Sequence, residues 1–436
     1  MISVAEELEK KKCDAASAVS RSIKSGDQVI LGHCAGVPLA LTDELVNQKD
    51  RLSHVKIFHM VPLHSCDYCA PEYEGIFRHV TTFVGKPTRT AVNEGRGDFI
   101  PCFFSQLPSC IREGSISCDV AFVSLTPPDE HGYMSLGVSV DYTLEAIKKA
   151  RTVVAEINDQ MPRTYGTFIH ISEVNYIVPV SYPIPEVPNP VISEVEEKIG
   201  QYIASLIEDG SNLQLGIGAI PDAVLQFLKE KKNLGIHSEM FSDGVVDLFH
   251  AGAVTNTNNT VNPGKFVATF LMGTKKLYDF VDNNPAVMMA PVDYTNNTLI
   301  AAQVEKLISI NSAIEVDIMG QVCAEMIGGT QFSAVGGQVD FVRAASISPG
   351  GKSIIAFPST TRKGTISRIV MKLSDGAAVT TSRNDVDYIV TEWGIARLKG
   401  KSLHDRAIAL IQIAHPDFRE DMIHSCTKEG IFHESV

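Results

Sequence analysis

A single carboxylate stands where a predicted strand gives way to a helix. Residues 234–250, LGIHSEMFSDGVVDLFH, predict a short strand that ends at Glu239, then a polar turn and a helix beginning near Ser242 or Asp243. Ligands of open α/β sheets gather at the carboxyl ends of strands. Between a serine and a methionine this carboxylate would be poorly hydrated, which favours a nucleophile or an acid of raised pKa. The same position also suits a solvated or salt-bridged structural glutamate, the commoner use of the residue.

A glycine loop precedes this segment. Residues 213–228, LQLGIGAIPDAVLQFL, predict a strand, a loop containing Gly216 and Gly218, and a helix with Pro221 near its first turn. Such a loop exposes backbone amides at a helix N-terminus, where negative charge is favoured, although the glycines also fit an ordinary tight turn. The Gly-Ile-Gly run begins a dinucleotide fingerprint, but Pro221 replaces its third glycine, which weakens a nicotinamide interpretation.

A second pair of glycines interrupts an apolar stretch further along the chain. Gly336 and Gly337 lie within FSAVGGQVDFVRAA, residues 332–345. Adjacent glycines permit a backbone nest or an oxyanion site. They are equally compatible with a bulge or the entry to a loop.

A cysteine pair raises the question of metal or redox chemistry. Cys66 and Cys69 form a C-x-x-C beside His59 and His64. No second pair follows at zinc-site spacing, and no redox-fold pattern surrounds the motif. The nine cysteines are an odd number and are scattered along the chain, which suits a reducing compartment. We therefore expect buried thiols here, with no metal and no redox cofactor.

The elements that would position these residues alternate between helix and strand. Apolar runs such as Val120–Val123 indicate central parallel strands that are buried on both faces. This alternation predicts the α/β class. The expected helices are 4–25, 38–52 and 142–151, and the expected strands are 28–32, 55–61, 119–125 and 152–157.

A proline-rich stretch divides the chain. Residues 178–191 read VPVSYPIPEVPNPV, which sustains neither a helix interior nor a central strand. Immediately afterwards, Ser193 and Glu196 form an S-x-x-E capping box that opens a new helix. A chain of 436 residues also exceeds the size of one hydrophobic core, so we expect two domains, 1–185 and 186–436.

The net charge and the hydropathy of the chain limit the kinds of partner that it can bind. The net charge of −13 argues against nucleic acid or an anionic membrane, because both require a basic face. We find no signal peptide pattern and no apolar run long enough to span a membrane. We therefore expect a cytoplasmic protein in which any anionic ligand is bound by local groups and not by a basic surface.

Several segments occur together in one order. They are LQLGIGAIPDAV, GIHSEMFSDGVVDL, GGQVDFVRAA and TEWGIARLKGKSLHDRA, with PPDEHGYMSLG in the first half. Together they resemble the acetyl-CoA hydrolase/transferase family, most closely its 4-hydroxybutyrate CoA-transferase and butyryl-CoA:acetate CoA-transferase branch. The resemblance spans essentially the whole chain, and only the Cys66 neighbourhood and the final dozen residues carry no family motif.

The resemblance implies a fold and a site. The fold is two open α/β domains of the CoA-transferase type with mostly parallel sheets, and the family's nucleophilic glutamate aligns with Glu239. The glycine segments are implied to hold CoA and the acyl oxygen, and a backbone contact to CoA is suggested near Ile314. The CoA-binding residues expected on this basis are Gln214, Leu215, Gly216, Ile217, Gly218, Ile314, Gly336 and Gly337.

The implied activity is transfer of CoA between short-chain acyl-CoA and carboxylates, such as 4-hydroxybutyrate or butyrate with acetyl-CoA. It would proceed by a ping-pong route through a glutamyl-CoA thioester, with CoA as a substrate and with no metal or redox cofactor. A homodimer or higher homo-oligomer is implied as well. Three alternatives remain: an acetyl-CoA hydrolase, a non-catalytic CoA-binding protein and, as the weakest, a nicotinamide dehydrogenase.

Overall fold

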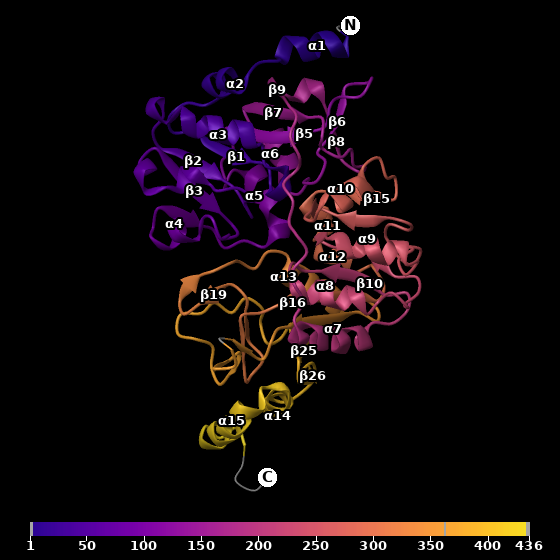
Figure 1. The fold of residues 1–436 in the computed structure, drawn as a ribbon. Coiled ribbons are helices and arrows are strands. Elements are labelled where there is room, and N and C mark those ends of the chain that lie inside the picture. The colour runs from indigo at the N-terminus through magenta and orange to yellow at the C-terminus, as the bar shows by residue number, and fades with distance from the viewer. Residues whose placement is uncertain (1–2, 362, 433–436) are drawn as a thin grey trace. The chain divides into compact units, whose positions relative to one another are not determined.

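A seven-stranded parallel sheet forms the centre of the first structural unit. In the computed structural model, which describes residues 3–361 and 363–432, the order of its strands is β4-β3-β2-β1-β5-β7-β9 (Figure 1). The six residues of β5 are all buried, as the predicted apolar run requires. The strands are β1 (Gln28–Leu31), β2 (Val55–Phe58), β3 (Phe77–Thr81), β4 (Gly97–Phe99), β5 (Val120–Leu125), β7 (Thr152–Asn158) and β9 (Tyr176–Val180).

The helices of the first unit follow the predicted alternation with one exception. The single helix expected over residues 4–25 is two helices in the structure. The side chain of Asp14 accepts a hydrogen bond from the Ser17 amide and so caps the N-terminus of the second helix. The main helices are α1 (Val4–Lys11), α2 (Ala15–Ser22), α3 (Leu39–Asn47), α4 (Arg89–Asn93), α5 (Leu107–Glu113) and α6 (Thr143–Lys149). An antiparallel pair, β6 (Tyr133–Ser135) and β8 (Phe168–His170), completes the segment up to β9.

The two units are not contiguous in the sequence. The first extends to Pro188 and also contains residues 266–295, whereas the second contains residues 189–265 and the chain from Asn296 onward. Residues 266–295 contribute the parallel pair β13 (Phe266–Ala268) and β15 (Val287–Met289), with β14 (Phe270–Leu271), α10 (Lys275–Val281) and α11 (Val292–Thr295). The first division lies close to the proline-rich stretch, and residues 266–295 return to the unit that precedes it.

The second unit has its own sheet, with a parallel core of β10, β16, β21 and β25. The antiparallel strand β26 borders β25, while β12 pairs antiparallel and β11 parallel with β10. The mostly parallel sheets of both units confirm the predicted α/β class. The strands are β10 (Asn212–Leu215), β11 (Gly235–Ile236), β12 (Met240–Phe241), β16 (Leu307–Ser312), β21 (Lys352–Ala356), β25 (Tyr388–Thr391) and β26 (Gly394–Arg397).

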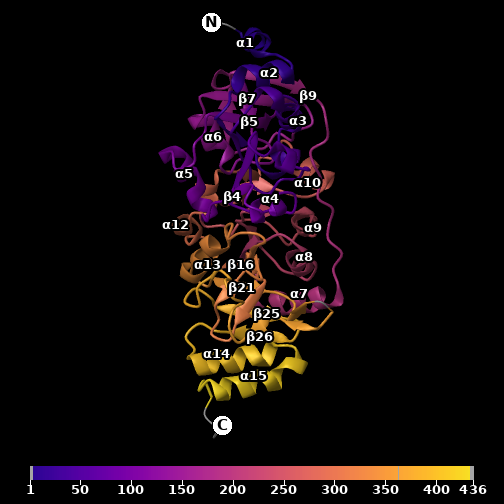
Figure 2. The same cartoon turned by 90° about the vertical axis from the view of Figure 1, so that its left-hand side faces the viewer.

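Helices cover this second sheet. The capping box predicted at Ser193 and Glu196 is present at the start of α7 (Glu194–Leu206), which packs on α8 (Ala219–Gln226). Two C-terminal helices, α14 (Leu403–Ile413) and α15 (Pro416–Lys428), lie alongside each other next to β26 (Figure 2). The other helices are α9 (Asp243–His250), α12 (Thr298–Ala301) and α13 (Gln338–Ile347).

The second unit also contains one small three-stranded sheet and two strand pairs. The sheet has the order β18 (Val322–Cys323), β17 (Glu315–Asp317) and β24 (Ile369–Val370), and the pairs are β19 (Met326–Ile327) with β20 (Thr330–Gln331) and β22 (Thr360–Thr361) with β23 (Ile366–Ser367). Within the described ranges of the chain, no helix combines the length and the apolar character needed to cross a membrane.

Candidate active site

Glu239 lies in the short connection between β11 and β12. The strand expected to end at this residue is shorter than predicted: it stops at Ile236, and the chain pairs again at Met240, opposite Leu215 of β10. The Leu215 amide also donates a hydrogen bond to Oγ of Ser238, at 3.0 Å. These contacts hold the Glu239 segment beside the end of β10, where the glycine loop begins.

The helix that follows Glu239 starts where the sequence predicted. It is α9, which begins at Asp243 with Ser242 as its N-cap residue. The Ser242 hydroxyl does not cap its own helix but donates to Asp222 Oδ1 on α8, at 2.8 Å. Burial raises the pKa of the Asp222 carboxyl, and this hydrogen bond opposes the rise. The contact ties the two helices that flank the Glu239 segment.

The carboxylate of Glu239 is partly buried and is held by an asparagine. Nδ2 of Asn296, a residue with no exposed surface, donates to Glu239 Oε2 at 2.7 Å. Hydrogen bonds to an ionised carboxylate are roughly twice as strong as those between neutral groups. The contact therefore gives the carboxylate a defined orientation.

Gly337 lies directly against the same carboxylate. A Cβ atom at this position would overlap with Glu239 Oε2 and with Nδ2 of Asn296, so only glycine leaves room for the pair. Gly336 has a φ of +53°, in the left-handed region that glycine adopts readily. In the described part of the chain, no protein acceptor receives a hydrogen bond from the amide of either glycine. Two backbone donors at the start of α13 are thus left for an anionic group.

The glycine loop is buried where it leaves β10 and exposed where it meets α8. Gln214 is buried, and its Oε1 accepts hydrogen bonds from Ser309 Oγ and Asn311 Nδ2 at 2.7 and 3.0 Å. The Gly216 amide donates to the Ile310 carbonyl at 3.0 Å. Beyond it, Ile217 is 48% exposed, and Gly218, with a φ of +121°, has nothing within 4 Å of where a Cβ would stand. The open part of the loop is therefore at these last two residues, directly before α8.

Ile314 lies in the turn between β16 and β17, and both of its backbone polar groups are engaged. Its amide donates to the Cys323 carbonyl at 2.8 Å, and its carbonyl accepts from Arg368 Nε at 2.8 Å. A contact from this backbone to CoA would have to use the second lone pair of the carbonyl.

The structure thus brings three of the predicted site positions close together, Leu215 beside the Glu239 segment and Gly337 against the carboxylate. Sequence reasoning missed Asn296. It is the first of two adjacent asparagines, and the second, Asn297, caps α12 by accepting from the Leu299 amide at 2.9 Å. The local pattern predicts a cap but does not distinguish the residue that reaches Glu239.

An oriented carboxylate beside unpaired backbone amides can carry out covalent acyl chemistry. The carboxylate is a nucleophile for an activated carbonyl, and the amides are donors for the oxyanion that such an attack creates. This combination requires no redox step.

Comparisons with known proteins place both halves of the chain in one family. Residues 4–192 match the acetyl-CoA hydrolase/transferase N-terminal domain, and residues 273–426 match the C-terminal domain of the same family. The 4-hydroxybutyrate coenzyme A transferase of Clostridium kluyveri is 53% identical over 97% of this chain and 99% of that protein. The butyryl-CoA:acetate CoA-transferase of Anaerostipes caccae is 38% identical, with both chains fully covered.

A solved structure gives the same result. The 4-hydroxybutyrate CoA-transferase of Porphyromonas gingivalis superposes with a TM-score of 0.85 at 42% identity, over 97% of this chain and 98% of that one. The two-domain α/β fold is therefore that of CoA-transferases. With both domains matched and full-length relatives well above 30% identity, this chain belongs to the acetyl-CoA hydrolase/transferase family and is an enzyme that transfers CoA groups.

Proposed function

We propose that this enzyme moves CoA between short-chain acyl-CoA thioesters and free carboxylates, through a glutamyl-CoA thioester formed on Glu239. The substrates we infer are 4-hydroxybutyrate or butyrate exchanging with acetyl-CoA, because the relatives named for these acids match along the whole chain. The observation on which the proposal chiefly rests is the Glu239 carboxylate itself, held by Asn296 and placed against Gly337.

The first half-reaction consists of two exchanges at carbonyl carbon. An oxygen of Glu239 attacks the acyl-CoA carbonyl, the C–S bond breaks, and a mixed anhydride and CoA thiolate result. The thiolate then attacks the glutamyl carbonyl of the anhydride, and the bond between the glutamyl carbon and the bridging oxygen breaks. The first acid leaves as a carboxylate, and CoA remains bound to Glu239 as a thioester.

The second half-reaction runs the same steps in reverse with another acid. Its carboxylate attacks the glutamyl thioester, CoA thiolate leaves, and the thiolate then takes the new acyl group from the anhydride. The energy of the thioester bond is retained, so no external energy source is needed. The kinetics are ping-pong, because the first acid leaves before the second reacts.

Each attack produces an oxyanion that needs a donor. The amides of Gly336 and Gly337 are the donors we assign to it, because they adjoin the carboxylate and make no bond to a protein acceptor in the described residues. Loss of one preorganised donor of this type costs about 10²–10³ in rate. The exposed amides of Ile217 and Gly218 at the start of α8 are the corresponding donors we assign to the phosphate groups of CoA.

Covalent trapping tests the proposal. The protein is incubated with acetyl-CoA, treated with hydroxylamine or borohydride, digested and examined by mass spectrometry. We expect modification of the peptide that contains Glu239 and none of the peptide that contains the exposed Glu230, which serves as the internal control. An unmodified Glu239 peptide under conditions of active turnover would rule out the covalent route.

A hydrolase differs from a transferase only in access of water to the thioester. With a transferase, acetyl-CoA turns over only when an acceptor acid is present, and the product is the acceptor's thioester. Release of free CoA that is independent of added acid would identify a hydrolase.

Further features remain part of this proposal. From the sequence and the resemblance we infer a cytoplasmic location and a homodimer or a multiple of it. The domain limits inferred from the sequence are 1–185 and 186–436, and of the second range residues 266–295 belong to the first structural unit. Light scattering coupled to gel filtration checks the oligomeric state, and a monomer would contradict it.

A further inference from the structure

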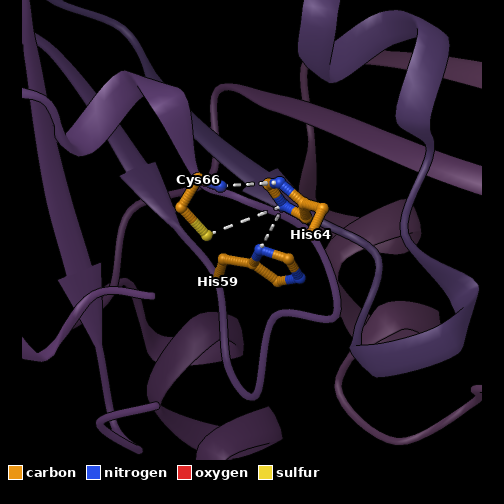
Figure 3. Close-up of side chains that lie close together, drawn as sticks. All are labelled: His59, His64 and Cys66. Carbon is orange, nitrogen blue, oxygen red and sulfur yellow. Dashed lines mark hydrogen bonds between the residues drawn. The ribbon is translucent and has the colours of Figure 1, made fainter. Parts of the chain in front are cut away.

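Three side chains with metal-ligating atoms converge just beyond the end of β2 (Figure 3). His59 follows β2 directly, while His64 and Cys66 lie in the loop that leads to the short 3₁₀ helix Asp67–Cys69. One ligand atom from each residue lies within 4.8 Å of the other two. All three belong to the first unit, and none takes part in the transfer reaction proposed above.

Two of the three separations between these atoms are close to those of a tetrahedral metal site. His64 Nε2 lies 3.4 Å from His59 Nδ1 and 3.8 Å from Cys66 Sγ. Zinc bonds of about 2.05 Å to nitrogen and about 2.3 Å to sulfur, at tetrahedral angles, separate two nitrogens by about 3.3 Å and a nitrogen from the sulfur by about 3.6 Å. Both measured distances are within about 0.2 Å of these values.

The surroundings of the group are buried and rich in imidazole. His59 and Cys66 are at most 1% exposed. His79 on β3 is buried as well, and neither of its ring nitrogens has a hydrogen-bond partner in the described residues. The proposed ligands therefore lie in a buried part of the first unit that contains a further imidazole.

We propose that His59 Nδ1, His64 Nε2 and Cys66 Sγ bind one Zn²⁺ ion, with water in the fourth position. The set of two imidazoles and one thiolate suits zinc, whereas Mg²⁺ and Ca²⁺ require oxygen ligands that this group does not contain. The site uses only Cys66 of the C-x-x-C motif, which is why counting paired cysteines in the sequence gave no indication of it.

Binding rearranges protons within the group. In the metal-free arrangement the Cys66 amide donates to His64 Nδ1 at 3.0 Å, and the planes of the two imidazoles are 19° apart. When Zn²⁺ binds Nε2 of His64, the ring proton moves to Nδ1, the bond from the amide is lost and the ring turns toward the ion. Cys66 loses its thiol proton to solvent, so one proton is released for each Zn²⁺ bound.

Metal analysis of the full-length protein tests the proposal. The chain is produced with added zinc, dialysed against metal-free buffer and analysed by plasma mass spectrometry. We expect about one zinc per chain, and after replacement by Co²⁺ a thiolate-to-cobalt absorption band in the near ultraviolet. Removal of zinc by a chelator is expected to lower the melting temperature by at least about 3 °C.

Cys69→Ser is the matched control, because Cys69 belongs to the same motif but not to the ligand group. It should keep both the zinc and the cobalt band, whereas Cys66→Ser should lose both. His64→Gln provides a second variant if Cys66→Ser does not fold. Wild-type protein without zinc, stoichiometric copper or iron in its place, or equal zinc in the Cys66→Ser and Cys69→Ser proteins would each overturn the assignment.

Discussion

Gly337 lies so close to Glu239 that a single methyl group on its Cα would overlap with carboxylate Oε2. The carboxylate therefore occupies space that any other residue at position 337 would fill. Next to this glycine, the buried Asn296 amide donates to the same oxygen at 2.7 Å, and the same methyl group would also overlap with its Nδ2. The nucleophile we propose is thus oriented by one hydrogen-bond donor and closely approached by a backbone without a side chain.

Gly337→Ala should displace the carboxylate. Because a misplacement of about 1 Å can cost about 10²-fold in rate, we expect kcat to fall at least about 100-fold. Steady-state kinetics with acetyl-CoA and butyrate measures this. Gly252→Ala is the control: it places alanine at φ +76° at the end of α9, with nothing within 4 Å, and should cost about 1 kcal/mol of stability without changing kcat. Equal kcat values for the two variants would contradict the proposed geometry.

Two neighbouring asparagines allow the orientation of the Glu239 carboxylate to be tested separately from the stability of the fold. Asn296→Ala removes a hydrogen bond to an ionised group, which is worth about 1.5–3 kcal/mol, so we expect kcat to fall about 10- to 150-fold. Asn297→Ala removes the cap of α12 and should lower stability by about 1 kcal/mol with kcat retained. Steady-state kinetics and urea unfolding of both variants test this prediction. A lower kcat in Asn297→Ala, with kcat retained in Asn296→Ala, would show that Asn296 does not orient the carboxylate.

Glu239→Gln keeps the size of the side chain but removes the nucleophile. We expect transfer between two acids to fall by more than about 10³-fold, as when a nucleophile is removed from other covalent enzymes. The matched control is Glu230→Gln, which changes an exposed glutamate of the same unit and should leave kcat unchanged. Transfer by Glu239→Gln at a rate near that of the control would disprove the covalent mechanism.

A buried carboxyl group in the first unit makes stability depend on pH. Glu156 on β7 accepts hydrogen bonds from the Leu41 amide at 2.6 Å and from the Tyr182 hydroxyl. Burial raises its pKa from 4.5 to about 7, although both hydrogen bonds oppose the rise. The folded state thus favours the protonated acid, so this contribution to stability is complete below pH 4.5 and is lost as the pH rises through about 7.

Between pH 4.5 and about 7, this one group lowers the free energy of unfolding by about 3 kcal/mol. Glu156→Gln, which resembles the neutral acid, should gain stability relative to wild type when the pH is raised from 5 to 8. Urea midpoints at both pH values measure the difference, with the exposed Glu113→Gln as control. If the difference between wild type and Glu156→Gln is the same at both pH values, the pKa of Glu156 is not raised.

Local features were predictable where the interactions that cause them are local. The capping box of Ser193 and Glu196 opens α7, and the apolar run Val120–Val123 lies within a fully buried strand. The helix expected over residues 4–25 was wrong in its middle, because the Asp14 cap outweighs the helical periodicity of the stretch. The strand predicted to end at Glu239 was also wrong, because its extent depends on pairing with β10.

The sequence by itself determined the α/β class, the family and the segment that carries Glu239. Helix periodicity, buried strands, caps and ordered motifs all depend on residues that are close together in the sequence. Only the tertiary structure decided that Asn296, 57 residues away in the chain, donates to Glu239 and that Gly337 adjoins it. It likewise decided that Cys66 joins two histidines rather than Cys69. The physical reason is that Asn296 and Gly337 reach Glu239 only through packing between distant segments, which leaves no local pattern in the chain. His59, His64 and Cys66 are neighbours in the sequence, but the path of their loop decides which side chains converge.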